Sequence, residues 1–451
     1  MASLSTSSPL SLTVTRREPI LVRPAKPTPH ELKQLSDIDD QEGLRFQIPT
    51  IFFYNSNPSV QPKDPVHLIR QALAQALVSY YPFAGRIVEG PSRKLSVNCT
   101  GEGVLFTEAD ADVELRLLGV EPGSPYLAEL LHDVPGSSGI LGCPLLLIQV
   151  TRFRCGGFAV AVRLNHTMSD GTGFHQFMDA VAEFARGGGA EAKMLPTVQP
   201  VWQRELLSAR SPPRVTCFHQ EYEQRASVTM SGNCQHEDMI QGSFFFGPKE
   251  IRAIQSHHSE RCTTFEALTA CVWRARTRAL GFDPEEIVQV SGYINVRGKL
   301  HIPDGYYGNA IVYPAVTARA ATLVTEPLGY AVRLVKAAKA QMSEEYVQSV
   351  ADFMVTKGRP MYTTAGNFLL SDNSRLGFDG LDFGWGKPVY GGPAAAIGPI
   401  SFCVRYKGGG GVDGRAVVLC LPRPAMERFK RELNEITRGK GARKVVIASS
   451  L

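Results

Sequence analysis

Residues 158–173 read FAVAVRLNHTMSDGTG, and this stretch combines three kinds of local pattern. Its first seven residues are apolar apart from Arg163, which is typical of a buried strand. His166 and Asp170 follow on a short polar loop. Apolar side chains then recur at helical spacing until a run of three glycines at 187–189. We therefore expect a buried strand that delivers a histidine and an aspartate to the start of a helix.

The same alternation of strands and helices continues on both sides of this stretch. In the first half, apolar β-rich residues predict a strand over 46–55, and helical spacing predicts a helix over 64–80. In the second half, the spacing predicts helices over 264–280 and 327–346 and a closing hairpin over 400–421. The pattern indicates an α/β or α+β protein built from two similar lobes.

A region rich in proline, alanine and polar residues separates the two halves. It follows the three glycines and contains strings such as MLPTVQP and SARSPPR. We expect an N-terminal lobe over 1–190, which carries the His166 loop, a crossover linker over 191–215, and a C-terminal lobe over 216–451.

Composition excludes several classes of function. The 451 residues carry 48 lysines and arginines against 43 aspartates and glutamates, a net charge of +5. This positive excess is small for the length of the chain, and the basic residues form no stripe with interleaved aromatics. We therefore do not expect nucleic-acid binding. The longest apolar stretch, 140–150, is too short to span a membrane. Nine scattered cysteines without a CxxC pair argue against a zinc site and favour a reducing, intracellular compartment.

The His166 loop admits more than one interpretation. A neutral imidazole at the end of a buried strand can accept a proton, as a general base does. Alternatively, His166 is a buried core histidine whose hydrogen-bonding groups all have partners, and Asp170 caps the helix near Thr172. The spacing does not require Asp170 to touch the imidazole. A metal site formed by His166, Asp170 and His175 fits neither an HxD nor an HExxH pattern.

The other sequence motifs argue mainly against alternative types of catalytic or nucleotide-binding site. The chain contains no GxSxG nucleophile elbow and no P-loop. Residues 409–414 spell GxGxxG, but they precede a predicted strand and not a helix, so we interpret them as a hairpin turn. The string DFGWG at 382–386 places two glycines around a tryptophan and by itself indicates a tight structural loop.

Taken together, these strings resemble the plant BAHD family of acyl-CoA-dependent acyltransferases. The resemblance runs from PAKPTP near the N-terminus to the last predicted helix. It is carried by YPFAGR from Tyr81, HTMSDG from His166, TFEALTA from Thr264, NVR from Asn295, YGNA from Tyr307 and DFGWG from Asp382.

The resemblance implies an α/β fold of two chloramphenicol-acetyltransferase-like lobes, each a mixed sheet with helices, joined by a long crossover loop around a solvent channel. His166 would act as general base while the alcohol attacks the thioester directly, without an acyl-enzyme. Asp170 would support the histidine loop by pairing with Arg297. The loop that contains Asp382, Gly384, Trp385 and Gly386 would be structural.

Further site residues follow from the same resemblance. Ser374 would stabilise the oxyanion, and Asn309 would give polar support near the channel. Arg261, Thr263 and Thr264 would contact coenzyme A. Acyl-CoA is the expected co-substrate, and neither a permanently bound cofactor nor a metal is expected. The protein is expected to act as a monomer.

Within the family, the opening residues and the string FDGLDFGWGKPVYGGPA look like the alcohol acyltransferase branch, which includes benzyl alcohol O-benzoyltransferases. This implies benzoyl-CoA and benzyl alcohol as substrates, and benzyl benzoate as a volatile or as an intermediate of salicylic acid biosynthesis. The alternatives are acetyl-, anthraniloyl- or hydroxycinnamoyl-CoA as donor. Two alternatives belong to other functional classes. One is a thioesterase that uses His166 to activate water, and the other is a catalytically silent binding protein of the same fold.

The last three residues, Ser449 to Leu451, are similar to the peroxisomal Ser-Lys-Leu signal, although the middle residue is not basic. We expect a peroxisomal protein, with a cytoplasmic enzyme and a frayed tail as the alternative.

Overall fold

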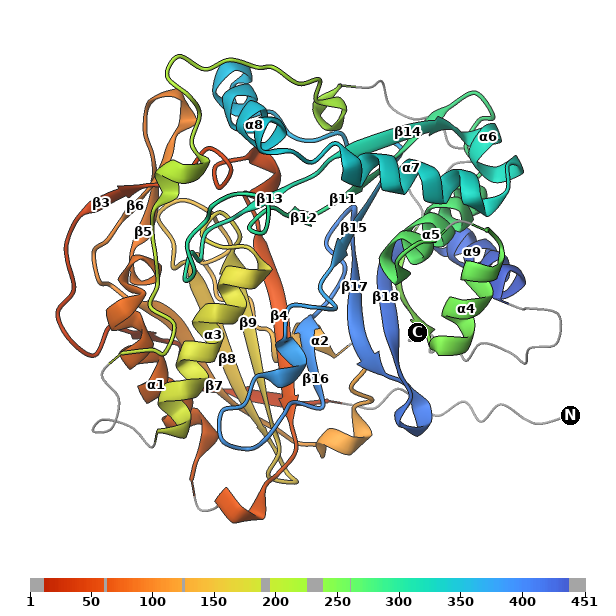
Figure 1. Cartoon of the computed structure of the whole chain (residues 1–451). Coiled ribbons are helices and arrows are strands. Elements are labelled where there is room, and N and C mark those ends of the chain that lie inside the picture. Colours follow the sequence, from red (N-terminus) through yellow and green to blue (C-terminus); the bar gives the residue numbers. More distant parts are fainter. Residues whose placement is uncertain are drawn as a thin grey trace, which may run out of the picture.

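Two mixed β-sheets, one drawn largely from each half of the chain, stand side by side in the computed structural model (Figure 1). The structure describes residues 12–60, 63–123, 126–187, 195–224, 238–259 and 261–437. Ser449 to Leu451 and the expected boundary at residue 190 lie outside these ranges. The α/β class with two sheet-rich lobes is as predicted.

The first sheet has seven strands in the order β1-β7-β8-β9-β4-β16, with β2 also paired to β7. A small separate sheet, β3-β6-β5, belongs to the same half of the chain. The strands of these two sheets are β1 (Val14–Arg16), β2 (Ile20–Val22), β3 (Leu32–Gln34), β4 (Gln47–Tyr54), β5 (Arg86–Glu89), β6 (Leu95–Asn98), β7 (Val104–Ala111), β8 (Leu146–Phe153), β9 (Phe158–Asn165) and β16 (Tyr390–Pro393).

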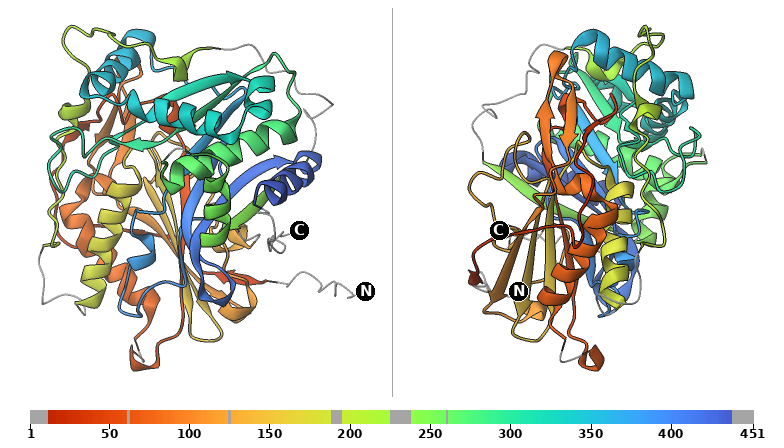
Figure 2. Two further views of the ribbon diagram at one scale, coloured as in Figure 1. Left: turned by 45° about the vertical axis from the view of Figure 1, so that its right-hand side comes forward. Right: turned by 90° about the vertical axis from the view of Figure 1, so that its left-hand side faces the viewer.

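Two long helices, α1 (Pro65–Ser79) and α3 (Gly171–Arg186), pack together over one face of this sheet (Figure 2). Their apolar stripes join the inward side chains of the strands in one core that includes Leu73, Phe177 and Val160. A short helix, α2 (Leu127–Leu130), lies between β7 and β8 in the chain. The predicted strand over 46–55 and helix over 64–80 correspond to β4 and α1.

The second sheet has six strands in the order β10-β18-β17-β15-β11-β14, and a two-stranded ladder joins β12 to β13. The strands are β10 (Met239–Phe246), β11 (Ile287–Gly292), β12 (Ile294–Asn295), β13 (Ile311–Val312), β14 (Ala315–Arg319), β15 (Asn367–Asp372), β17 (Ile400–Lys407) and β18 (Asp413–Pro422). The helices are α4 (Pro248–Ser256), α5 (Thr264–Leu280), α6 (Ala320–Thr325), α7 (Leu328–Ala340), α8 (Glu344–Lys357) and α9 (Arg423–Thr437). No helix in the described ranges has the length and apolarity needed to cross a membrane.

The helix predicted over 327–346 is wrong as a single element. The structure ends α7 at Ala340 and starts α8 at Glu344. Ser343 separates them, because its hydroxyl accepts a hydrogen bond from Tyr346 N at 3.1 Å and so caps a new helix. Apolar residues continue through the break, which hides it from a count of helical spacing.

The DFGWG loop was expected in the C-terminal lobe, and this assignment needs correction. The strand β16 that follows the loop pairs antiparallel with β4 at the edge of the first sheet. Phe383 and Trp385 belong to the core of that sheet and its helices. The segment therefore crosses from the second half of the chain to complete the first lobe, as Figure 1 shows for blue β16 beside red β4.

Candidate active site

His166 occupies the first residue after β9, where the chain leaves the sheet and turns into α3. Its backbone N–H donates to the carbonyl of Phe46 at 2.9 Å, and the two rings lie 5.1 Å apart. The side chain is buried, and the residue is 6% exposed. The neighbouring strands β4 and β8 flank β9 on both sides and hold this position rigidly.

The hydrogen bonds of His166 define which ring nitrogen carries the proton. Nδ1 lies 3.1 Å from Asn309 Oδ1. The amide nitrogen of Asn309 contacts oxygens only, among them His166 O at 2.8 Å and Asp39 Oδ1 at 2.9 Å. Since Oδ1 of Asn309 can only accept, Nδ1 of His166 must donate, and the lone pair of the neutral ring is on Nε2. Burial lowers the pKa of His166, which favours this neutral form.

Asp170 combines both roles that the sequence suggested for it. As N-cap of α3, its Oδ1 accepts from Thr172 N at 3.1 Å and Gly173 N at 3.0 Å. Its Oδ2 lies 2.6 Å from Arg297 Nη1 and also accepts from Ala310 N at 2.9 Å. Burial alone would raise the pKa of Asp170, but the Arg297 charge and these hydrogen bonds outweigh it and lower the pKa. The carboxylate therefore stays charged and ties the histidine loop to the second half of the chain.

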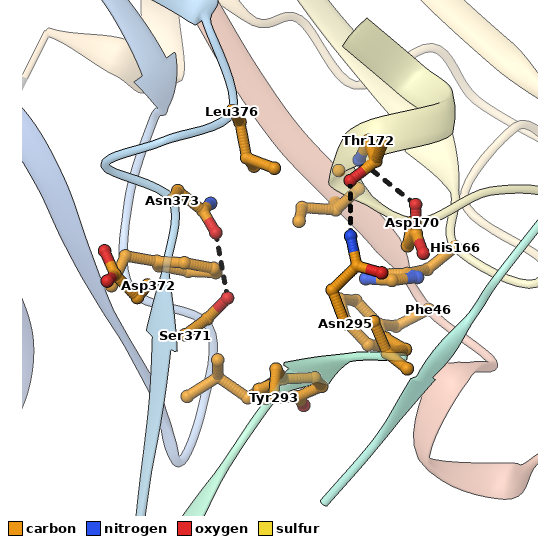
Figure 3. A pocket seen from close by; sticks show the side chains of 15 residues that line it. Phe46, His166, Asp170, Thr172, Tyr293, Asn295, Ser371, Asp372, Asn373 and Leu376 are labelled. Carbon is orange, nitrogen blue, oxygen red and sulfur yellow. Dashed lines mark hydrogen bonds between the residues drawn. The ribbon is translucent and has the colours of Figure 1, made fainter. Parts of the chain in front are cut away.

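A cavity opens beside His166. Figure 3 shows two walls facing each other, with His166, Thr172 and Asn295 on one side and Ser371 and Asn373 on the other. Much of the remaining lining is apolar or aromatic and consists of Phe46, Ile48, Tyr293, Ile311, Leu376, Ile400 and Phe402. The cavity suits a small substrate with an apolar body and few polar groups.

The residues expected at the oxyanion and at coenzyme A lie outside this cavity. Ser374 directly follows the lining residue Asn373 but lines a neighbouring pocket together with Thr264. Arg261 and Thr263 line a third, more open pocket at the start of α5. The structure therefore brings Asn309 to His166 and does not bring Ser374 there.

The DFGWG loop is held by its own aspartate. Asp382 Oδ1 accepts from Gly384 N at 2.7 Å and from Gly386 N at 2.8 Å. The Trp385 ring packs edge-on against Phe158, with centroids 5.1 Å apart. None of these residues lines the His166 cavity. The loop fixes the first lobe and does not reach the candidate site.

Two other histidines give no competing site. The ring of His175 packs against Phe378 at 5.8 Å, and the described residues contain no group of three metal-binding side chains. His219 lies between Glu221 (3.1 Å) and Ser349 (2.9 Å), as in a hydrolase triad. However, Ser349 is fully buried, and its hydroxyl oxygen already accepts two backbone N–H groups. This trio fastens the segment 216–221, just after the expected linker, to α8 and offers no accessible nucleophile.

Sequence reasoning missed Asp39 and the aromatic lining residues Tyr293 and Phe402. No local motif marks them, because they reach the site from separate segments. Only the histidine loop was visible as a local pattern, whereas Arg297 and Asn309 came from the family resemblance.

Comparison with known proteins places this geometry in a family. A family model described as the Transferase family matches residues 10–436. "Alcohol acyltransferase 16" of Actinidia chinensis var. chinensis is 60% identical over 97% of this chain and 96% of its own. "Benzyl alcohol O-benzoyltransferase" of Nicotiana tabacum is 54% identical over 95% of this chain and 94% of its own.

Solved structures agree on the fold. Vinorine synthase superposes with a TM-score of 0.72 at 21% identity and covers 94% of this chain and 98% of its own. TRI101 of F. sporotrichioides, complexed with coenzyme A and T-2, gives 0.68 at 17% identity over 89% of this chain and 97% of its own. With a family model over nearly its whole length and relatives at more than half identity, the chain belongs to the Transferase family of BAHD acyltransferases and is an acyl-transferring enzyme.

Proposed function

We propose that the protein transfers the acyl group of an acyl-CoA to the hydroxyl of an alcohol, with His166 as general base. The observation that carries this proposal is a buried neutral imidazole, with its Nδ1 proton committed to Asn309 and its Nε2 able to accept, on the wall of a largely apolar cavity. Curated relatives named alcohol acyltransferases support the alcohol as acceptor.

The chemistry needs one proton acceptor and one electrophile. An alcohol is a poor nucleophile until a base removes its proton during the attack. Nε2 of His166 takes that proton as the hydroxyl oxygen attacks the thioester carbonyl. When the tetrahedral intermediate collapses, the protonated ring returns the proton to the departing sulfur of coenzyme A. Asp170 and Arg297 take no part in proton transfer and hold the loop in place.

For the substrates we propose benzoyl-CoA and benzyl alcohol, which would give benzyl benzoate. Relatives named benzyl alcohol O-benzoyltransferase are 54% identical to this chain. An aromatic acceptor also suits a wall that includes Phe46, Tyr293 and Phe402. Acetyl-, anthraniloyl- and hydroxycinnamoyl-CoA are the alternative donors, because pocket volume decides among them.

Product analysis by mass spectrometry tests this function. Purified protein receives benzoyl-CoA and a panel of alcohols, with His166→Ala as the comparison variant. We expect benzyl benzoate from the wild type and a loss of about 10²–10⁴-fold in the variant. Release of free benzoate without ester would indicate a thioesterase instead. Turnover with a different acyl-CoA alone would keep the class and replace the donor.

We also propose that the enzyme acts as a monomer in the peroxisome. For the compartment, the support is that benzoyl-CoA is a product of fatty-acid-type β-oxidation chemistry. Light scattering after size-exclusion chromatography measures the first point. For the second, a fluorescent fusion at the N-terminus is compared with and without Leu451; cytosolic signal from both would reject it.

A further inference from the structure

Asp39 is a buried carboxylate on the segment between β3 and β4, and it contacts the partner of the candidate base. The residue is 0% exposed. Its Oδ1 accepts from Asn309 N at 2.8 Å, from Asn309 Nδ2 at 2.9 Å and from Arg204 Nη1 at 2.7 Å. Its Oδ2 accepts from Ser36 N at 3.0 Å and from Ser36 Oγ at 2.7 Å. With both oxygens bonded, the carboxylate has a fixed orientation.

These contacts determine which way the amide of Asn309 faces. Its Nδ2 contacts Asp39 Oδ1, His166 O at 2.8 Å and Thr167 O at 3.3 Å. If the amide turned over, Oδ1 would face three oxygens, and Nδ2 would face Nδ1 of His166. Of the three oxygens, only that of Asp39 belongs to a carboxylate, and charge-assisted hydrogen bonds are about twice as strong as neutral ones. Asp39 is therefore the strongest single determinant of the amide orientation.

We propose that Asp39 is a positioning residue of the acyl-transfer site. Acting through Asn309, it keeps His166 in the tautomer that has the proton on Nδ1 and the lone pair on Nε2. The role of Nε2 as proton acceptor rests on the function proposed above, whereas the tautomer itself does not.

Arg204 extends this arrangement into the segment between the lobes. Its Nη1 pairs with Asp39, and its Nη2 donates to the carbonyl of Met168 at 2.9 Å, inside the histidine loop. The guanidinium also stacks on Trp202, with its carbon 4.4 Å from the ring centroid. Arg204 therefore binds both the Asp39 carboxylate and the loop that carries His166.

Asp37 provides a matched control, because it has a similar environment and different partners. It is also buried, at 5% exposed, and pairs with Arg359 at 3.0 Å and Lys94 at 2.7 Å. Its second oxygen accepts from Ala209 N at 2.8 Å. Asp37→Asn removes a buried, arginine-paired charge from the same segment without altering a hydrogen bond of Asn309. Its effects measure the general cost of such a change.

The first test is the tautomer of His166, read from nitrogen NMR of protein with ¹⁵N-labelled histidine and assigned by comparison with His166→Ala. We expect a protonated Nδ1 and an unprotonated Nε2 both in the wild type and in the control variant Asp37→Asn. In Asp39→Asn the new amide nitrogen opposes either the donors of Asn309 or the backbone N–H of Ser36. Only the second orientation keeps an acceptor for Asn309 Nδ2, and that acceptor is uncharged, so we expect a mixture of tautomers. A proton on Nε2 in the wild type, or an unchanged signal in Asp39→Asn, would overturn the proposal.

The second test is kinetic and uses Asn309→Ala as a partner variant. We expect kcat of Asp39→Asn to fall at least about tenfold relative to Asp37→Asn, with KM for acyl-CoA within about threefold. Because both residues act through one path, the double variant should be no slower than Asn309→Ala alone. Additive losses in kcat would mean that Asp39 acts independently of Asn309 and would overturn the proposal.

Two further comparisons distinguish failure of the positioning proposal from failure of the variant to fold and from failure of the proposed function. If Asp39→Asn does not fold, Ser36→Ala loosens the same carboxylate by removing one donor and should give a smaller change in the same tautomer signal; no change would again reject the proposal. If the wild type forms no ester while the spectra behave as expected, the proposed function fails and the positioning by Asp39 stands.

Discussion

At the scale of single residues, the imidazole of His166 is subject to opposing influences. Burial lowers its pKa, while Asp170, Asn309 and Asp39 each act to raise it, and the net shift is downward. A buried neutral base keeps its lone pair available at a pH where an exposed histidine would already be protonated.

This shift predicts the pH dependence of the reaction. A general base works in its deprotonated form, so kcat/KM should rise with pH and level off above the pKa of His166 in the free enzyme. Because that pKa is lowered, the midpoint should lie below the ordinary histidine value of about 6.5. Rates of ester formation between about pH 5 and 8 measure it. A midpoint above the ordinary value would contradict the desolvated site.

The ion pair between Asp170 and Arg297 predicts a large stability effect. Asp170→Asn keeps the helix cap, since asparagine caps as well as aspartate, and removes one partner of a buried pair. Such a change costs about 3–5 kcal/mol of unfolding free energy. Since the pKa of Asp170 is lowered in the folded state, this stability is present above the unfolded pKa and is lost as the pH falls through the folded one.

Asp64→Asn is the control for that measurement. Asp64 caps α1 and pairs with Arg152 at 2.7 Å, but its side chain is 40% exposed. An exposed pair contributes about 0–1 kcal/mol. Urea denaturation of both variants near neutral pH should separate them clearly. Equal losses would show that burial of the Asp170 pair adds nothing.

What the sequence revealed of the site follows from distance along the chain. His166 and Asp170 lie in one short motif, so the loop and its two interpretations were visible. Arg297 came from family resemblance. Asp39 and Asn309 meet across 270 residues, and no spacing rule connects positions so far apart. Ser374 was assigned from resemblance alone, and its side chain lies in the neighbouring pocket.

At the scale of elements, the DFGWG loop depends on backbone conformations that favour glycine. Gly386 has φ +92°, and a Cβ added there would meet no atom within 4 Å. Gly380, six residues earlier, has equally open space and no positive φ. The two positions therefore separate conformational strain from steric crowding.

We expect Gly386→Ala to lower the unfolding free energy by about 1–2 kcal/mol, because a side chain disfavours this left-handed conformation. Gly380→Ala should stay within about 0.5 kcal/mol of the wild type. Denaturant titrations of the two variants give the comparison. A stable Gly386→Ala protein would mean that the loop can adopt another backbone path.

Local signals also explain which elements were predicted well. The helix over 264–280 matches α5 to the residue, because Thr263 and Glu266 form a capping box at its start and Gly281, at φ +62°, ends it. The break between α7 and α8 has a cap as well, Ser343, but no glycine or proline interrupts the apolar spacing there. A period alone could not reveal it.

At the scale of the whole molecule, the first lobe is completed by residues from far along the chain. The pairing of β16 with β4 joins positions such as Tyr390 and Phe53. Phe383 and Trp385 fill the core below. The alternation of strands and helices predicted two lobes. It could not predict that β16 joins the first lobe, because strand pairing between distant segments leaves no local pattern.

Because β16 and the aromatic residues of the DFGWG loop complete the first lobe, we predict that the N-terminal half cannot fold alone. A fragment that ends at residue 224 lacks β16 and the two core aromatics, so we expect it to show no cooperative thermal transition. Co-expression with residues 225–451 should restore a soluble complex with near-wild-type melting. Circular dichroism of the purified fragment decides the matter, and a sharp transition from the fragment by itself would refute the expectation.

The order of synthesis gives β16 a further consequence. The ribosome completes β4 roughly 340 residues before it completes β16. At about 5–20 residues per second, the apolar edge IFFY of β4 waits on the order of 20–70 s for its neighbour. An unpaired apolar edge is a template for pairing with other chains. Slower translation lengthens this interval, so the yield of native enzyme in a cell depends on how that edge is shielded while the rest of the chain emerges.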